Sequence, residues 1–186
     1  MLIDHLVYKA ADLAGAVAEV EELLGVRARA GGQHIGLGTH NALLALGPHT
    51  YLEIIAPDPG QPAPSAPRPL SLDGVRRSGL VGWAIACHDI HAAVAKARRR
   101  GYDPGEVASM QRATPTGAVL RWRLTLGAVA GGLLPFLISW GDTEHPDPAS
   151  LAPLLDALGA DAELRPAAAP ALIARLSGPN GSTVLH

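Results

Sequence analysis

In the first 57 residues, some apolar positions form the short runs of strands and others recur at the spacing of one helix face. A short apolar run at 2–9 is followed by Asp12 and then by apolar residues at the spacing of one helix face. Asp12 suits an N-cap and Gly25 a helix end, so the pattern predicts a helix over 12–24. The stretch NALLALGPHTYLEIIAP then predicts two strands joined at 47–49. The helix face consists of Leu13, Ala16, Val17, Val20, Leu23 and Leu24.

The same order starts again near residue 79. LVGWAIACHDI predicts a strand that leads to Asp89, and HDIHAAVAKARRRGY predicts a second helix ending at Gly101. A shift of 77 positions places Asp12 on Asp89 and residues 16–18 on 93–95. The strands AVLRWRLTL and LPFLISWG follow. The chain therefore predicts two similar β-α-β-β-β modules.

Two further segments complete the pattern. Residues 57–69, PDPGQPAPSAPRP, are too proline-rich for a helix or a central strand, so we expect a linker or surface arm outside any cavity. Apolar spacing in 150–159 predicts a helix, and the turn sequence at 178–181 predicts a hairpin. We therefore expect one domain with these parts: module one 1–57, linker 58–78, module two 79–142 and C-terminal extension 143–186.

Composition and charge narrow the class of protein. The 186 residues are 48% hydrophobic, which is enough for a substantial core. A net charge of −2 gives no basic excess, so we expect no nucleic-acid partner. No apolar run has the length of a membrane helix, the N-terminus has no signal-peptide pattern, and the single Cys87 excludes an internal disulfide. These features predict a soluble cytoplasmic domain with no membrane partner.

The stretch GGQHIGLGTHN at 31–41 allows three interpretations: a phosphate loop, a metal site or a tight turn. It lacks the last glycine of GxGxxG, and no helix pattern follows it, which argues against a phosphate loop. The stretch instead predicts a strand carrying His34, a turn using Gly38 and a second strand starting near Asn41. We expect Gly36 to keep the wall of a cavity open.

Strand alternation assigns faces to two polar residues. In YLEIIAP, Tyr51, Glu53 and Ile55 share one face, and in the first strand His5 lies opposite Asp4. A lone carboxylate in an apolar strand is costly unless it is paired, protonated or metal-bound. His5 and Glu53 therefore form a candidate metal-binding or catalytic pair, or a hydrogen-bonded pair that binds nothing.

These motifs resemble the vicinal oxygen chelate superfamily, which includes glyoxalase I, extradiol dioxygenases and bleomycin-resistance proteins. The closest likeness is to its glyoxalase-like branch, through DHLV at 4–7, GGQHIGLGTHNAL at 31–43, YLEIIAP at 51–57 and PFLISWGDTEHP at 135–146. The resemblance implies an α+β fold in which two paired modules form a curved sheet around a cavity, with the C-terminal helix and β-hairpin added. It also implies a divalent metal held by a His and a Glu of each module.

The second module departs from that ligand pattern. The 77-residue shift places Gly82 at the position of His5, and LPFLISW has no carboxylate where module one has Glu53. The metal ligands that remain are His5, Glu53 and, if its strand turns it inward, His34. We therefore expect zinc, nickel, manganese or iron to be held weakly or not at all.

The candidate functions follow from this site. One is metal-assisted isomerase, lyase or dioxygenase chemistry on a small organic molecule, with Glu53 and His34 as catalytic residues. A second is a metal-free binding or sequestration protein of the antibiotic-resistance type, and a third is a regulatory or scaffold domain. A homodimer is compatible with the first two. The predicted substrate-binding residues are Asn41, Arg121, Arg123 and Trp140; the alternatives are a structural or turn role for Asn41, a solvated sheet face for the two arginines, and core packing for Trp140.

Overall fold

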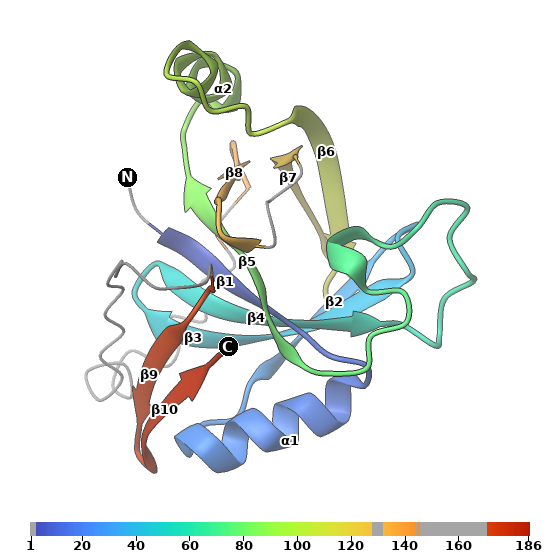
Figure 1. Ribbon diagram of the computed structural model, residues 1–186. Coiled ribbons are helices and arrows are strands. Elements are labelled where there is room, and N and C mark those ends of the chain that lie inside the picture. Colours follow the sequence, from blue (N-terminus) through green and yellow to red (C-terminus); the bar gives the residue numbers. More distant parts are fainter. Residues whose placement is uncertain (1–2, 128–131, 144, 146–170) are drawn as a thin grey trace.

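The computed structural model describes residues 3–127, 132–143, 145 and 171–186 (Figure 1). The chain forms a mixed α+β fold with few helices, which confirms the predicted fold class. The elements are β1 (Ile3–Lys9), α1 (Leu13–Leu24), β2 (Arg29–His34), β3 (Thr39–Gly47), β4 (Thr50–Pro57), the short 3-10 helix η1 (Pro69–Ser71), β5 (Gly79–Ala86), α2 (Ile90–Arg99), β6 (Glu106–Ala113), β7 (Val119–Leu126), β8 (Phe136–Ser139), β9 (Ala174–Gly178) and β10 (Gly181–Leu185).

Eight strands close into a barrel in the order β1-β4-β3-β2-β6-β7-β8-β5. Each half contributes four adjacent strands with the same internal order. The outer pairs β1–β4 and β5–β8 are parallel, and the other pairs within each half are antiparallel. The halves join through β1–β5 and β2–β6, so the barrel closes within one chain.

Strand β6 was not identified from the apolar pattern. Its sequence EVASMQRA is polar, and most of its residues are exposed or half-buried. The repeat itself contains the missing signal, because β2 starts at Arg29 and β6 starts 77 positions later at Glu106. Strand β6 completes the second β-α-β-β-β unit and forms the seam with β2.

Both helices begin at their predicted caps and α1 ends as predicted, whereas α2 ends at Arg99 with Arg100 as its C-cap, one residue before the predicted Gly101. Asp12 accepts a hydrogen bond from Gly15 N at 2.8 Å, and Gly25 ends α1 with a φ of 74°. Asp89 caps α2 in the same way, by accepting from Ala92 N at 3.0 Å. The buried face of α1 is narrower than predicted, because Leu23 is 38% exposed. The residues buried on that face are Ala16, Val17, Val20 and Leu24.

Alternation along β4 separates the two sides of the sheet, as predicted. Leu52 and Ile54 pack in the cluster that contains the buried residues of α1. Tyr51, Glu53 and Ile55 face the interior of the barrel. The sheet thus has one apolar side against α1 and a mixed side around a cavity.

Within the segment 57–69, which was predicted to lie outside the cavity, Pro69 at its end is the residue that enters the cavity wall. Pro69, Leu70 and Ser71 line the cavity, and the next residue, Leu72, is fully buried. Leu70 and Ser71 both have positive φ angles, of 58° and 53°. The linker returns to the barrel because its apolar residues pack with the internal cluster formed by β1, β4, β7 and β8.

The C-terminal hairpin forms as predicted and packs beside α1 (Figure 1). Its end is fixed to the barrel by a hydrogen bond from Leu80 N to His186 O of 2.6 Å. At its turn, Asn180 Nδ2 donates to Glu22 O at 3.0 Å. The predicted helix over 150–159 lies outside the described residues. No helix in the described parts of the chain has the length and apolar character needed to cross a membrane.

Candidate functional site

A cavity of about 770 Å³ occupies the interior of the barrel. This volume falls in the range typical of small-molecule pockets, roughly 300–1,000 Å³. Its two halves differ in chemistry. The polar lining residues of module one are His5, Lys9, His34, Thr39, Asn41, Tyr51 and Glu53. Apart from Arg112 and Thr125, the lining residues of module two are mainly apolar and include Leu80, Val81, Met110, Trp122, Leu124, Phe136, Ile138 and Trp140.

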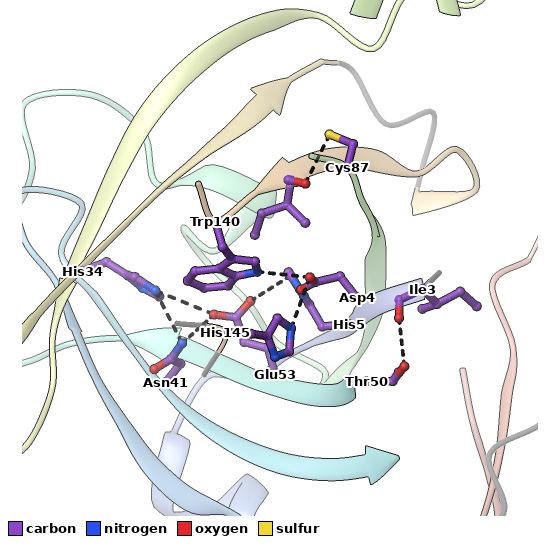
Figure 2. Close-up of polar contacts among 11 residues, drawn as sticks. Ile3, Asp4, His5, His34, Asn41, Thr50, Glu53, Cys87, Trp140 and His145 are labelled. Carbon is purple, nitrogen blue, oxygen red and sulfur yellow. Dashed lines mark hydrogen bonds and ion pairs between the residues drawn. The ribbon is translucent and has the colours of Figure 1, made fainter. Parts of the chain in front are cut away.

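The Glu53 carboxylate lies between two imidazoles (Figure 2). His5 Nε2 is 3.7 Å from Oε2, and His34 Nε2 is 3.7 Å from Oε1. These three side chains come from β1, β2 and β4, which alternation and pairing place around the same end of the cavity. The structure therefore brings together the three residues for which the sequence predicted metal-binding or catalytic roles.

Asp4 lies behind His5 and fixes its ring. Asp4 Oδ1 is 2.7 Å from His5 Nδ1, and Oδ2 accepts from Trp140 Nε1 at 3.0 Å. His145 Nε2 lies 3.2 Å from the same Oδ2. An ionised carboxylate can only accept, so the proton of this hydrogen bond is on His5 Nδ1, and Nε2 faces Glu53 Oε2. Sequence alternation did not predict this contact, because a register shift in the β1–β5 pairing lies between Ile3 and His5.

The electrostatics of this cluster favour an ionised Asp4. Burial by itself raises the pKa of Asp4, but hydrogen bonds with His145 and His5 and their positive charge bring it well below its usual range. Burial raises the pKa of the Tyr51 hydroxyl far above its ordinary value, and the charges of Asp4 and Glu53 act in the same direction. Tyr51 therefore stays protonated while its ring stacks on His5 at 4.7 Å.

His34 is a neutral imidazole near pH 7. Burial lowers its pKa, and this outweighs the opposite effect of the Glu53 charge. Its Nδ1 lies 2.9 Å from the Thr39 hydroxyl, and its Nε2 lies 3.4 Å from Asn41 Nδ2. Because the Asn41 amide nitrogen can only donate, Nε2 is the acceptor and Nδ1 carries the proton.

Asn41 orients the Glu53 carboxylate. Its Nδ2 donates to Oε1 at 2.6 Å, which leaves Oε2 as the less engaged oxygen. Gly31 makes this placement possible, because a Cβ there would lie 2.2 Å from Asn41 Oδ1. Gly36 does not keep the cavity wall open as predicted. It lies in the turn after β2 with a φ of 81°, and no atom lies within 4 Å of where its Cβ would be.

The polar cluster does not fit a three-ligand metal site. Ligand atoms about 2.0–2.2 Å from one ion can be 3.7 Å apart, so the His5–Glu53 pair alone is compatible with a metal. The Asn41 amide N–H group, however, lies against both His34 Nε2 and Glu53 Oε1, where an ion shared by those two residues would have to sit. Among the described residues, no group of three or more His, Cys, Asp or Glu side chains is arranged to hold a metal ion.

Arg121 and Arg123 lie on the outer face of β7, where both are exposed. The prediction that they bind a ligand in the cavity is wrong, because β7 turns the bulky Trp122 and Leu124 inward. Alternation alone gave two equivalent choices of face for this strand. Trp140 does line the cavity, and its indole N–H is engaged by Asp4.

The sequence analysis missed Arg112, a buried cavity residue on β6. Its side chain lines the cavity, and the residue is only 4% exposed. Nη1 donates to the Gly31 carbonyl. Burial lowers the pKa of Arg112, while Glu53 and Tyr51 act in the opposite direction. The signal that would have revealed it is again the 77-residue repeat, which predicts a strand starting at residue 106.

A closed barrel of two like modules around a polar cluster is the arrangement of the glyoxalase fold. The sequence profile of the family described as "Glyoxalase-like domain" matches residues 3–172. The chain belongs to this family. Among curated proteins, no sequence matches the chain significantly.

Solved structures share the fold. A hypothetical protein from Staphylococcus aureus has 15% identity and a TM-score of 0.61, over 98% of this chain and 83% of that one. A variant of Streptomyces coelicolor methylmalonyl-CoA epimerase in complex with 2-nitronate-propionyl-CoA has 19% identity and a TM-score of 0.51, over 74% of this chain and 95% of its own. The Mycobacterium tuberculosis methylmalonyl-CoA epimerase has 24% identity and a TM-score of 0.49, over 81% and 91%. The family match confirms the resemblance to the glyoxalase-like branch that the motifs predicted.

Proposed function

We propose that the protein is an enzyme that moves a proton on a small carbonyl compound bound in the barrel cavity. Glu53 is the base and acts through Oε2. The observation that carries this proposal is the position of its carboxylate, which is held between His5 and His34 at the wall of a cavity of about 770 Å³. A carboxylate in such a site can remove a proton from a carbon next to a carbonyl group, and return of the proton to another atom, or to the opposite face of that carbon, is an isomerisation.

The neighbouring side chains have distinct roles in this proposal. Asn41 occupies Oε1 and so fixes the direction of Oε2. His5, with its proton held on Nδ1 by Asp4, presents Nε2 beside Oε2 and can accept or relay the proton. His34 stays neutral, because burial lowers its pKa, and its Nε2 lies 3.7 Å from Oε1 on the other side of the carboxylate.

The proposal needs no metal ion. Two protein ligands leave an ion largely hydrated, so we expect zinc, nickel, manganese or iron(II) to bind weakly or not at all. The named superfamily members support only a coarser statement. An epimerase with the same fold has been solved in complex with 2-nitronate-propionyl-CoA, and epimerisation belongs to the same class of proton-transfer reaction.

The alternative function is binding or sequestration of a small molecule without chemistry. The apolar lining of module two favours it, because Trp122, Phe136 and Trp140 form a wall that holds a ligand without reacting. The two functions make different predictions for Glu53. A binding protein keeps its affinity for the ligand when the Glu53 carboxylate becomes an amide. A proton-transfer enzyme loses its catalysed reaction.

Exchange with solvent deuterium separates them. The protein is incubated in D2O with 2-oxobutanoate, acetoin and levulinate, and loss of the proton next to the carbonyl is followed by NMR. We expect catalysed exchange in at least one compound, and a loss of about 100-fold or more in Glu53→Gln. Glu106→Gln is the matched control, because that residue is exposed on β6.

Two results would overturn the proposal. One is exchange at the same rate in Glu53→Gln and in the native protein. The other is saturable binding of these compounds, measured by calorimetry, with no exchange above the rate in buffer. The second result would establish the binding protein instead.

A further inference from the structure

Arg112 is the one buried cation whose charge the described residues leave without a close partner. Its only hydrogen bond among them is from Nη1 to the neutral carbonyl of Gly31. Within the described residues, no carboxylate lies within 4.0 Å of its guanidinium. A buried guanidinium that has lost its water and has no carboxylate beside it is costly, and an anion from solution would offset that cost.

The strand pairing places Arg112 beside the reactive cluster. Arg112 and His34 are register partners across the β2–β6 seam. Directly opposite residues of an antiparallel pair have Cβ atoms about 4.5–5.5 Å apart on one face of the sheet. Both side chains line the cavity, so a group bound to Arg112 lies next to His34 and within reach of Glu53.

The charged side chains that line the cavity include more than one cation. Among the described lining residues, Lys9 and Arg112 are the cations and Glu53 is the anion, while the ionised Asp4 lies behind His5, where His5, Trp140 and His145 hold its carboxylate. His34 adds no positive charge, because burial lowers its pKa. The remaining wall, from Leu80 and Met110 to Trp122 and Phe136, is apolar.

We infer that the cavity takes an organic anion, with its charged oxygens on the Arg112 guanidinium and its apolar body against module two. The remaining N–H groups of the guanidinium suit the paired oxygens of a carboxylate or phosphate monoester. This inference rests on the proposed function for its choice of site, but it concerns recognition and not chemistry. It names the substrate class as small carbonyl compounds that carry an acidic group.

Calorimetric titration with three probes tests it. Hexanoate and hexyl phosphate carry the two anionic groups, and hexanamide has the same chain without charge. We expect the native protein to bind at least one anion tenfold or more tightly than hexanamide. Arg112→Met should lose that preference and bind hexanamide as before, which also shows that the variant is folded. Arg121→Met is the matched control, because that arginine is exposed on the outer face of β7.

Two further variants keep the test decisive. Arg112→Lys keeps the positive charge but loses the planar guanidinium, so it should retain part of the anion binding. It serves as the test if Arg112→Met does not fold. Glu53→Gln should bind the anion as tightly as the native protein or more tightly, because a negative charge is removed from the cavity. In Glu53→Gln, the loss of exchange tests the proposed function, and the retained binding of the anion tests the role of Arg112. The two proposals can therefore fail separately.

Equal affinity of the native protein for hexanamide and both anions would overturn the inference. A preference for the anion that survives in Arg112→Met or is lost in Arg121→Met would also overturn it. Preference for hexanoate over hexyl phosphate assigns the acid as a carboxylate, and the reverse assigns a phosphate.

Discussion

Asp4 and His5 are neighbours in sequence, and their side chains are joined by a 2.7 Å hydrogen bond between Oδ1 and Nδ1. Adjacent residues of a regular strand point to opposite faces, so this contact depends on the irregular pairing of β1 with β5 between Ile3 and His5. Trp140 of module two binds the other oxygen of the same carboxylate. The contact thus links the two halves of the barrel behind the reactive cluster.

Asp4 is a positioning residue, and its replacement tests the orientation of His5. In Asp4→Asn we expect the exchange rate to fall about 10–100-fold, the effect typical of losing a carboxylate behind a functional histidine. The apparent KM should change little. Nitrogen-15 NMR of the imidazoles should show His5 moving from the Nδ1–H form to a mixture of tautomers. Asp73→Asn, at an exposed site, is the control. An unchanged His5 spectrum would exclude the positioning role.

The same carboxylate predicts a dependence of stability on pH. Because the folded-state pKa of Asp4 is lowered, its contribution is complete above the usual Asp pKa of about 4 and is lost as pH falls below it. The free energy of unfolding of the native protein, measured with urea, should therefore decrease between about pH 5 and pH 2. The slope should be smaller in Asp4→Asn. Parallel curves for the two proteins would contradict this prediction.

Two strand glycines provide a matched test of the Asn41 packing. Gly31→Ala places a Cβ against Asn41 Oδ1, where an ideal atom would be 2.2 Å away, so we expect a loss of about 1–3 kcal/mol in the free energy of unfolding. Gly47→Ala meets no atom within 4 Å and should stay within about 0.5 kcal/mol. Thermal and urea unfolding measure both. Gly31→Ala should also reduce exchange, because Asn41 no longer holds Glu53.

Metal titration tests the expected weak site. After treatment with a chelator, zinc, nickel, manganese and iron(II) should bind weakly by calorimetry, because His5 and Glu53 alone leave most ligand positions to water. Any binding through His34 should be lost in His34→Ala and kept in His40→Ala. His40 lies in β3 and is 3.9 Å from Asp58 outside the cavity. Tight stoichiometric binding would show that the Asn41 amide rotates to admit an ion.

Module one could be predicted in detail because its sequence carries strong signals. A capped amphipathic helix and apolar strands predicted the elements of module one. Alternation along β4 placed Glu53 on the face toward the interior of the barrel. Module two was harder, because β6 is polar and carries no apolar run. Arg112 was missed with that strand. The arginines of β7 were assigned to the wrong face, since alternation gives two faces and only packing decides which is inside.

The two modules repeat one architecture, but the polar side chains of the cavity lie mostly in the first. In the proposed function, one copy of the unit supplies the chemistry, and the other supplies most of the surface that selects a ligand. Substitutions in the apolar wall of the second copy can change which molecule is accepted while Glu53 and its two histidines remain in place. This separation allows the specificity of the barrel to diverge independently of its reaction.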